Sequence, residues 1–360
     1  MEIGIIGLPT SGKTTIFNAL TGANRATSAA STGKLELFSA SVDVPDPRID
    51  QLSAMYHPKK TTYAKVTYVD IAGMDQELGK TGLSGELRNK LAPLDAFLYV
   101  IRAFLSNTVP HVFGSVDPQR DLEHLESEFL LADLIAAETQ VERITERLRK
   151  GARGEERERL EEDLLTFQQL RQELDAGRPL RDLELDASTK ARLRGFGFLT
   201  IKPVLVVLNT DDDPSFTPAD IHFAHRSSAV LALKGQLEME LRELPPDEVS
   251  AFMDEYGIRE LALPRVIQLS YQLLGLHSFF TVGEDEVRAW TLPVGGTALD
   301  AAAAIHSDLA RGFIRAEVVA FKDLTAAGSM TAARRMGKVH LEGKSYIIKD
   351  GDVVHIRFSV

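Results

Sequence analysis

The 360-residue chain contains no cysteine, which excludes disulfide bonds and thiolate metal sites and fits a reducing compartment. Long apolar runs are also missing, because the stretch 95–101 is far too short to span a bilayer. The first twenty residues contain no basic segment and no cleavage pattern, so we expect no signal peptide. Basic residues are not in excess, since 41 Lys and Arg face 52 Asp and Glu. The net charge of −11 argues against a protein that coats nucleic acid, and we expect a cytoplasmic protein without membrane contact.

Short apolar or alternating runs at 2–8, 65–70, 97–101 and 204–208 have the length of strands. Continuous apolar runs are typical of parallel strands that helices cover on both faces. Helix-compatible residues follow the first run, and Gly22 is the expected stop. Strands that alternate with helices predict a doubly wound α/β domain, which we assign to 1–118 and 200–278.

A different pattern occupies residues 119–199. Apolar residues recur there at spacings of three, four and seven, and most of the other positions are Glu, Arg, Gln or Asp. The pattern predicts two long amphipathic helices, joined at a turn marked by Gly151 and Gly154, that form an antiparallel coiled-coil arm. Because another strand follows at 204–208, we expect the arm to be an insertion in the α/β domain.

The tail, 279–360, is predicted to be a compact β-rich domain. Its sequence alternates in several places, and a small helix is expected near 298–305. Segments 345–349 and 352–358 flank Asp350-Gly351, which predicts a hairpin.

The segment 7–14 (GLPTSGKT) matches the P-loop pattern G-x-x-x-x-G-K-[ST], and it follows a strand and opens a helix as that motif requires. Gly7 and Gly12 let backbone amides turn inward around a phosphate. Lys13 is expected to span the β- and γ-phosphates, and Thr14 to bind Mg²⁺. The alternative, a glycine-rich turn that binds nothing, is disfavoured by the strand–helix context. Further nucleotide contacts are predicted for Pro9, Thr10, Ser11 and Thr15.

A second motif, Asp70-Ile71-Ala72-Gly73, follows the next long strand. We expect Asp70 to hold Mg²⁺ through water and the Gly73 amide to contact the γ-phosphate. The next residue is Met74, where Ras-type GTPases carry a glutamine that orients the attacking water. Methionine cannot do this, so hydrolysis is expected to be very slow or to use another polar group.

A base-binding loop is predicted after the strand at 204–208. Residues 209–212 stand where guanine-binding proteins carry N-K-x-D, so Asn209 would hold the loop and contact the base. Asp212 would accept from the N1 and N2 hydrogens of guanine, while Thr210 replaces the lysine whose stem covers the ring. Ala232 is a weaker candidate for the last base-contacting loop. The alternative is a polar loop without nucleotide contact.

With these motifs in view, the sequence resembles the YchF group of Obg-like ATPases over nearly its whole length. The tail is the most specific part of the match and is similar to that group's TGS domain, a ubiquitin-like β-grasp. The resemblance implies an ATPase with a G domain, a coiled-coil insertion and a TGS domain, acting as a ribosome-associated regulator in translation and stress. With the motifs above, we expect a slow, Mg²⁺-dependent enzyme. The matching segments are 44–48, 69–73, 131–133, 287–291, 305–306, 311–316, 342–344 and 350–352.

The same resemblance assigns further roles and marks three departures. His111 matches a histidine proposed to assist hydrolysis in the family, although a loop histidine without a catalytic task is the alternative. Thr10 and Ser11 replace the family's Asn-Val, of which the asparagine is linked to potassium binding. The switch I threonine would align near Lys34, and Asp212 stands where the family carries glutamate.

Together, these arguments predict catalytic roles for Lys13, Gly73 and His111, and magnesium ligation by Thr14 and Asp70. ATP is favoured over GTP, and a GTPase or a non-hydrolysing, nucleotide-gated binding module stay open. A P-loop small-molecule kinase is disfavoured because no Arg-rich lid is evident. We expect a monomer that contacts the ribosome or its RNA through the TGS domain and the arm. The basic residues of the tail, which are either that contact or a solvated face, are Arg311, Arg315, Arg334, Arg335, Lys338, Lys344 and Lys349.

Overall fold

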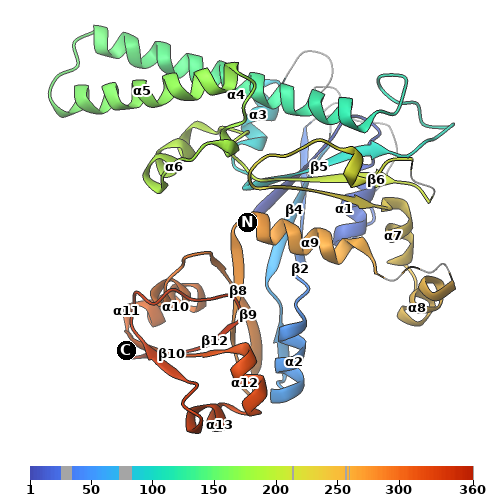
Figure 1. The fold of residues 1–360 in the computed structure, drawn as a ribbon, viewed down its shortest axis with the longest axis vertical. Helices are drawn as coiled ribbons and strands as arrows, with labels where there is room; N and C mark the ends of the chain where they lie inside the picture. Colours follow the sequence, from blue (N-terminus) through green and yellow to red (C-terminus); the bar gives the residue numbers. More distant parts are fainter. Residues whose placement is uncertain (26–34, 73–82, 213–214, 256–257, 259, 360) are drawn as a thin grey trace. The chain divides into compact units, whose positions relative to one another are not determined.

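The computed structural model describes most of the chain, namely residues 1–25, 35–72, 83–212, 215–255, 258 and 260–359. The chain divides into two compact units (Figure 1). One combines Met1–Ala40 with Thr67–Val266, and the other combines Ser41–Val66 with Ile267–Val360. An α/β unit that carries a helical arm and a second, sheet-containing unit agree with the predicted fold class. The predicted domain limits, 1–118 with 200–278, 119–199 and 279–360, stay a prediction.

The first unit is built on a sheet with the strand order β2-β4-β1-β5-β6-β7. Its pairs β4–β1, β1–β5, β5–β6 and β6–β7 are parallel. Every residue of β5 and β6 is buried, as the continuous apolar runs predicted. Because parallel strands end at one edge of the sheet, the residues that follow β1, β4, β5 and β6 meet there. The strands are β1 (Glu2–Ile6), β2 (Glu36–Asp43), β4 (Lys65–Ala72), β5 (Ala96–Ala103), β6 (Val204–Thr210) and β7 (Ser228–Leu233).

The arm consists of two long helices, α4 (Pro118–Arg149) and α5 (Glu155–Asp175), which run side by side (Figure 1). Their apolar stripes meet in one core. The turn between them uses Gly151 at φ 97° and Gly154 at φ 59°, so the predicted glycine-marked connection is confirmed. The other helices that lie wholly or partly in this unit are α1 (Lys13–Thr21), α3 (Gly85–Leu91), α6 (Ala187–Leu193), α7 (Gly235–Leu241), α8 (Pro246–Glu255) and α9 (Ala262–Leu273).

Buried polar contacts hold the base of the arm. Asp133 on α4 is fully buried, and its carboxylate accepts from the amides of Leu199 and Thr200 at 2.7 to 3.0 Å. Lys202, in the same loop, donates to the carbonyls of Leu91 and Ala92 at the end of α3, at 2.8 and 2.7 Å. Burial lowers the pKa of the Lys202 ammonium to about 8. The loop therefore ties α4 to α3 through two buried charged groups.

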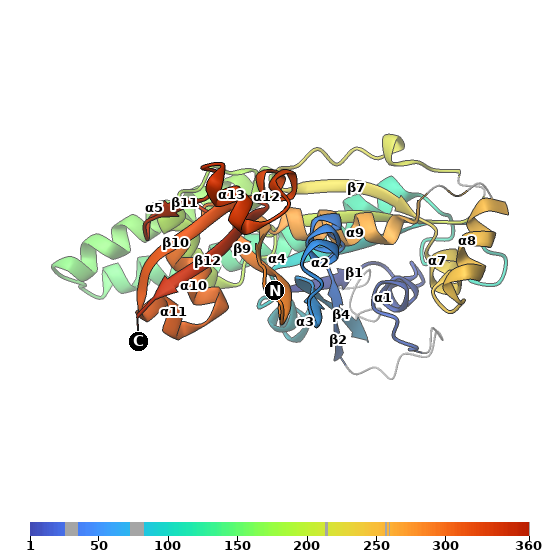
Figure 2. The ribbon, with the colours of Figure 1, turned by 90° about the horizontal axis from the view of Figure 1, so that it is seen from below.

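The second unit contains a sheet with the order β11-β10-β12-β8-β9-β3. α10 (Ala298–Ile305), which confirms the predicted helix, and α11 (Ser307–Arg311) lie on one face of this sheet, while α12 (Phe321–Ala327) and α13 (Met330–Arg335) lie toward the other (Figure 2). The strands are β3 (Lys60–Thr62), β8 (Leu276–Thr281), β9 (Glu286–Pro293), β10 (Phe313–Ala320), β11 (His340–Glu342) and β12 (Asp352–Phe358).

The predicted hairpin around Asp350-Gly351 is wrong. Segment 345–349 makes only an isolated bridge between Ile347 and Thr297, and β12 pairs with β10 and β8 instead. The reason is that the backbone of 346–348 bonds elsewhere: the Tyr346 carbonyl accepts from Ala298, and the Ile348 amide donates to Gly296.

The segment 41–66 belongs to this unit, a placement that the sequence pattern did not predict. It contains α2 (Pro47–Tyr56) and β3, which adds to β9 in parallel. Arg48 donates to both Asp46 and Asp350 at 2.8 to 3.2 Å and so fastens the segment to the β12 end of the sheet. Among the described residues, no helix has the length and apolar character needed to cross a membrane.

Candidate nucleotide-binding site

The loop after β1 folds as a tight turn that requires glycine at two positions. Gly12 lies at φ 96° directly before α1, and a Cβ there would meet Asn209 Nδ2 at 2.1 Å. A Cβ on Gly7 would lie 2.4 Å from the Val100 carbonyl oxygen. Thr10 also has a positive φ, 62°, which a β-branched residue rarely adopts. The turn thus forms a cradle into which backbone amides can point.

Lys13, the first residue of α1, folds back over this loop. Its ammonium donates to the Leu8 carbonyl at 2.9 Å, and the residue is 7% exposed. Ser11 Oγ is buried and has no hydrogen-bond partner in the described part of the chain. Pro9 and Thr15 flank the loop and are half-buried. A buried ammonium beside an unpaired hydroxyl and the start of a helix suits a polyphosphate.

Two oxygen ligands converge beside the loop. Thr14 Oγ1 lies 3.2 Å from Asp70 Oδ2, at the end of β4, and Asp70 is 1% exposed. Hydroxyl and carboxylate oxygens fit Mg²⁺, which usually takes its other ligands from phosphates and water. The described residues contain no group of three or more His, Cys, Asp or Glu that could enclose a metal alone. The residues present therefore suit a metal that is held jointly with a nucleotide.

Arg25 is a member of this site that the motifs did not identify. Its guanidinium pairs with Asp70 Oδ2 and lies over the ring of Phe38, with Cζ 3.5 Å from the centroid. The sequence offered no signal for it, because Arg25 follows the end of α1 and belongs to no P-loop motif. Three predicted features, Gly73, Met74 and the switch I position at Lys34, lie outside the described residues.

Asn209, at the end of β6, connects the P-loop to Gly235, the first residue of α7. Its Nδ2 donates to the Ser11 carbonyl at 2.9 Å, and its Oδ1 accepts from the Gly235 amide at 3.2 Å. Both polar ends are thus engaged, and the residue is 4% exposed. The position therefore explains a loop-holding role for Asn209.

The other predicted base contacts are less constrained. The side chain of Asp212 is 87% exposed and lies 3.4 Å from the Lys234 ammonium. Ala232 is half-buried within β7, two residues before Lys234. Lys234 ends the segment 232–234 that the sequence suggests as the last base-contacting loop, and its base contact stays a prediction.

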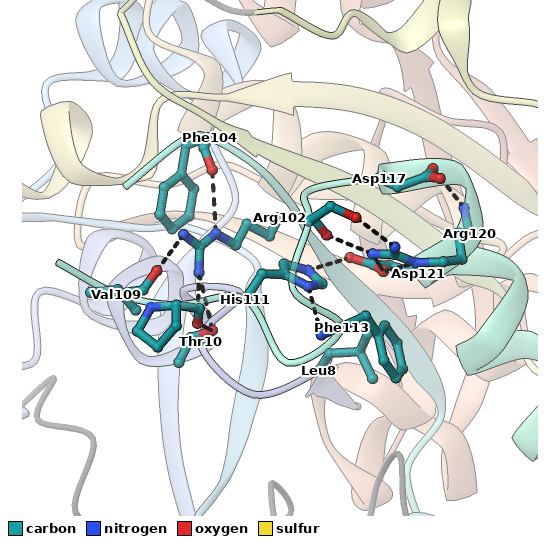
Figure 3. Close-up of polar contacts among 12 residues, drawn as sticks. Leu8, Thr10, Arg102, Phe104, Val109, His111, Phe113, Asp117, Arg120 and Asp121 are labelled. Atoms are coloured by element: carbon teal, nitrogen blue, oxygen red, sulfur yellow. Dashed lines mark hydrogen bonds and ion pairs between the residues drawn. The ribbon is translucent and has the colours of Figure 1, made fainter. Parts of the chain in front are cut away.

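The last residues of β5 organise the loop that contains His111 (Figure 3). Arg102 is 2% exposed and donates to the carbonyls of Phe104 and Val109 at 3.2 and 2.8 Å. It also donates to Thr10 Oγ1 at 3.2 Å, which links this loop to the P-loop. The sequence signal was a single arginine near the end of an otherwise apolar strand, and it belongs to no motif.

His111 has both ring nitrogens engaged (Figure 3). Its Nδ1 accepts from the Phe113 amide at 3.1 Å, so Nε2 carries the proton that is donated to Asp121 Oδ2 at 2.7 Å. Both side chains are nearly buried, at 3% and 2% exposed. Asp121 also accepts from Arg120, the residue before it on α4. This arrangement fixes the ring within its loop.

The sequence and the fold agree with those of known proteins. Residues 276–359 match the YchF-GTPase C-terminal family, described as a protein of unknown function (DUF933), and residues 2–139 match the 50S ribosome-binding GTPase family. The chain is 38% identical to a ribosome-binding ATPase YchF of Bacillus subtilis over 100% of both chains. A protein of that name from Escherichia coli O157:H7 is 37% identical over 100% of this chain and 99% of its own.

Similarity extends to a solved structure, that of the Schizosaccharomyces pombe YchF GTPase. It aligns with a TM-score of 0.82 and 27% identity over 99% of this chain and 97% of the solved one. Full-length matches above 30% identity, together with the P-loop, the Asp70 motif and the sheet order, lead to one conclusion. The chain belongs to the YchF family of P-loop nucleotide-binding proteins of the GTPase class.

Proposed function

We propose that this protein is a slow, Mg²⁺-dependent nucleoside triphosphatase that acts as a ribosome-associated switch in the cytoplasm. The observation that carries the proposal is the convergence of the P-loop with the Thr14–Asp70 pair at one edge of the sheet. The names of the relatives, ribosome-binding ATPase, support the same activity and partner.

Each group at the site has a physical task. The amides of the P-loop and the Lys13 ammonium neutralise the β- and γ-phosphates, and Thr14 and Asp70 hold magnesium. The metal, when bound, would neutralise part of the negative charge of the phosphates. Replacing Lys13 with alanine should reduce the affinity for ATP and for GTP with Mg²⁺ present. Undiminished binding of both would refute the proposed site.

Hydrolysis is proposed to be slow because Met74 cannot orient water. His111 could assist only after its ring leaves Asp121, since both nitrogens are engaged in the arrangement described above. Single-turnover phosphate release should fall in a His111→Ala variant if the ring takes part. Equal rates in the variant and the parent protein would assign His111 to loop structure alone.

ATP is the proposed substrate. Thr210 cannot cover a base as a lysine stem does, and the Asp212 carboxylate already faces Lys234. A GTP-specific version of the switch is the second candidate, because Asp212 retains the acid that recognises guanine. Titration with fluorescent ATP and GTP separates the two candidates. A tenfold or greater preference for GTP would overturn the proposal.

A non-hydrolysing, nucleotide-gated binding module is the remaining alternative. Single-turnover assays with Mg²⁺, with and without ribosomes, distinguish it from the switch. Phosphate release in either case supports the switch, and its absence in both supports the module.

The proposed partner is the ribosome or its RNA, contacted through the TGS-like C-terminal region and the arm. Arg315 and Arg335 are exposed on the second unit and offer positive charge to phosphates. Reversing both to glutamate should weaken sedimentation with ribosomes while nucleotide affinity is retained. Arg226→Glu, an exposed position on the first unit, is the charge-reversal control. Equal sedimentation of the double variant and the control would exclude Arg315 and Arg335 as ribosome contacts.

A further inference from the structure

The carboxylate of Asp70 accepts from two groups through the same oxygen. Thr14 Oγ1 lies 3.2 Å from Oδ2, and the Arg25 guanidinium donates to that oxygen as well. The side chain of Asp70 is 2% exposed, whereas that of Arg25 is 22% exposed. The permanent positive charge of Arg25 therefore lies beside Asp70 Oδ2, the oxygen that a magnesium ion, or a water bound to it, would contact.

The backbone of Arg25 is anchored to the helix that begins at the P-loop. The Arg25 amide donates to Asn18 Oδ1 at 3.1 Å, and Asn18 Nδ2 donates to the Arg25 carbonyl at 2.8 Å. Asn18 is 4% exposed within α1. The backbone of Arg25 is thus held close to the site. The guanidinium can change its hydrogen-bond partner only by rotation of the side chain.

The guanidinium contacts two aromatic rings while it is paired with Asp70. Its Cζ lies 3.5 Å from the centroid of Phe38 and 5.9 Å from that of Phe17. Arginine stacks well on aromatic faces, and its planar fork binds phosphate oxygens as readily as carboxylate oxygens. Arg25 thus has a second stabilising contact besides Asp70, and its guanidinium is equally suited to a carboxylate and to a phosphate.

We propose that Arg25 and magnesium compete for Asp70, and that the nucleotide resolves this competition because its phosphates take the guanidinium. The inference rests on the proposed function, since it concerns the same site. Arg25 hinders metal binding at Asp70, and the nucleotide removes this hindrance when its phosphates bind the guanidinium. By linkage, metal and nucleotide then bind cooperatively. Arg25 is then a positioning residue that couples metal affinity to nucleotide affinity.

The experiment measures direct binding and not turnover. Mn²⁺ replaces Mg²⁺ as a spectroscopic probe, and its affinity for the full-length protein without nucleotide is measured by electron paramagnetic resonance. Arg25→Gln, which removes the charge and keeps much of the side-chain length, should bind Mn²⁺ at least about tenfold more tightly. Arg25→Lys keeps the charge without the fork, so its affinity should stay within about threefold of the parent value. Asp70→Asn should abolish the gain when it is combined with Arg25→Gln.

A second measurement follows the nucleotide. In EDTA, Arg25→Gln should bind a fluorescent ATP analogue at least about fivefold more weakly than the parent protein does, because the arginine–phosphate contact is lost. Arg25→Lys serves here as the folded, charge-retaining comparison. Equal Mn²⁺ affinity in the parent protein and Arg25→Gln would overturn the inference. Failure of the proposed function would be visible separately, as absence of nucleotide binding by the parent protein with Mg²⁺.

Discussion

Replacement of Gly12 by alanine tests whether the P-loop is shaped by the contacts described above. The residue lies at φ 96°, and a Cβ there would meet Asn209 Nδ2 at 2.1 Å and no other group closer than 3.4 Å. Alanine in such a backbone conformation costs about 1 to 2 kcal/mol. The clash is far inside van der Waals contact, so Asn209 must move.

Moving Asn209 breaks two buried hydrogen bonds, to the Ser11 carbonyl and from the Gly235 amide. Each buried group left unpaired costs about 1 to 3 kcal/mol. The sum is about 3 to 8 kcal/mol against the conformation that binds phosphate, which corresponds to at least about a hundredfold loss of nucleotide affinity. The assay is titration with fluorescent ATP and GTP in the presence of Mg²⁺.

Gly151 provides a matched control. Its φ, 97°, is nearly the same as that of Gly12, and nothing lies within 4 Å of a Cβ built there. Gly151→Ala should therefore lose about 1 to 2 kcal/mol of local stability and leave nucleotide affinity unchanged.

A double variant isolates the clash itself. In Gly12→Ala/Asn209→Ala the added methyl has no close neighbour, so its cost in urea unfolding should be less than the sum of the two single costs. Strict additivity, or nucleotide affinity of Gly12→Ala within threefold of the parent protein, would refute the reasoning.

Three further changes test the buried polar groups. Burial lowers the pKa of Lys202 from 10.5 to about 8. Between these pH values Lys202 is protonated in the unfolded chain but not in the folded protein. The free energy of unfolding should therefore rise with pH across that window, by about 3 kcal/mol. The slope, measured by urea unfolding at several pH values, should be absent in Lys202→Met. Asp121→Ala should lower the free energy of unfolding by about 2 to 3 kcal/mol, because the buried Nε2 proton of His111 loses its acceptor. Asp121→Asn keeps an oxygen acceptor and should cost less than about 1 kcal/mol. Similar losses in the two variants would contradict the His111–Asp121 pairing. Burial would raise the pKa of Glu317, but hydrogen bonds from two arginines outweigh it and lower the pKa, so its contribution should be present at neutral pH and disappear as the pH falls below about 4. The difference in melting temperature between Glu317→Ala and the parent protein should accordingly be larger at pH 7 than at pH 3.

The sequence predicted the features that depend on local pattern. The P-loop, the apolar strands β5 and β6 and the two helices of the arm each leave a strong periodic or spaced signal. The predicted loop-holding role of Asn209 also agrees with the contacts that its side chain makes. These features are readable because a spacing of a few residues determines them.

What the sequence could not predict depends on contacts between distant segments. Arg25 reaches Asp70 across 45 positions, and Arg48 reaches Asp350 across 302. The hairpin prediction failed for a similar reason, because the backbone of 346–348 bonds to residues before and within α10. Local propensity cannot reveal which of several competing partners a backbone or an isolated charged side chain will find.

The attachment of the arm through Asp133 has a consequence for how the family can diversify. The chain leaves the sheet along α4 and returns at Leu199 and Thr200, where the buried Asp133 carboxylate joins the two ends of the arm. The buried Arg181, which donates to Glu126 and to the Lys202 carbonyl, belongs to the same junction. Residues beyond it, from about 140 to 178, can be lengthened, shortened or exchanged while the route from β5 to β6 stays the same. Evolution or an engineer could thus give the same hydrolytic core a reach suited to a different assembly.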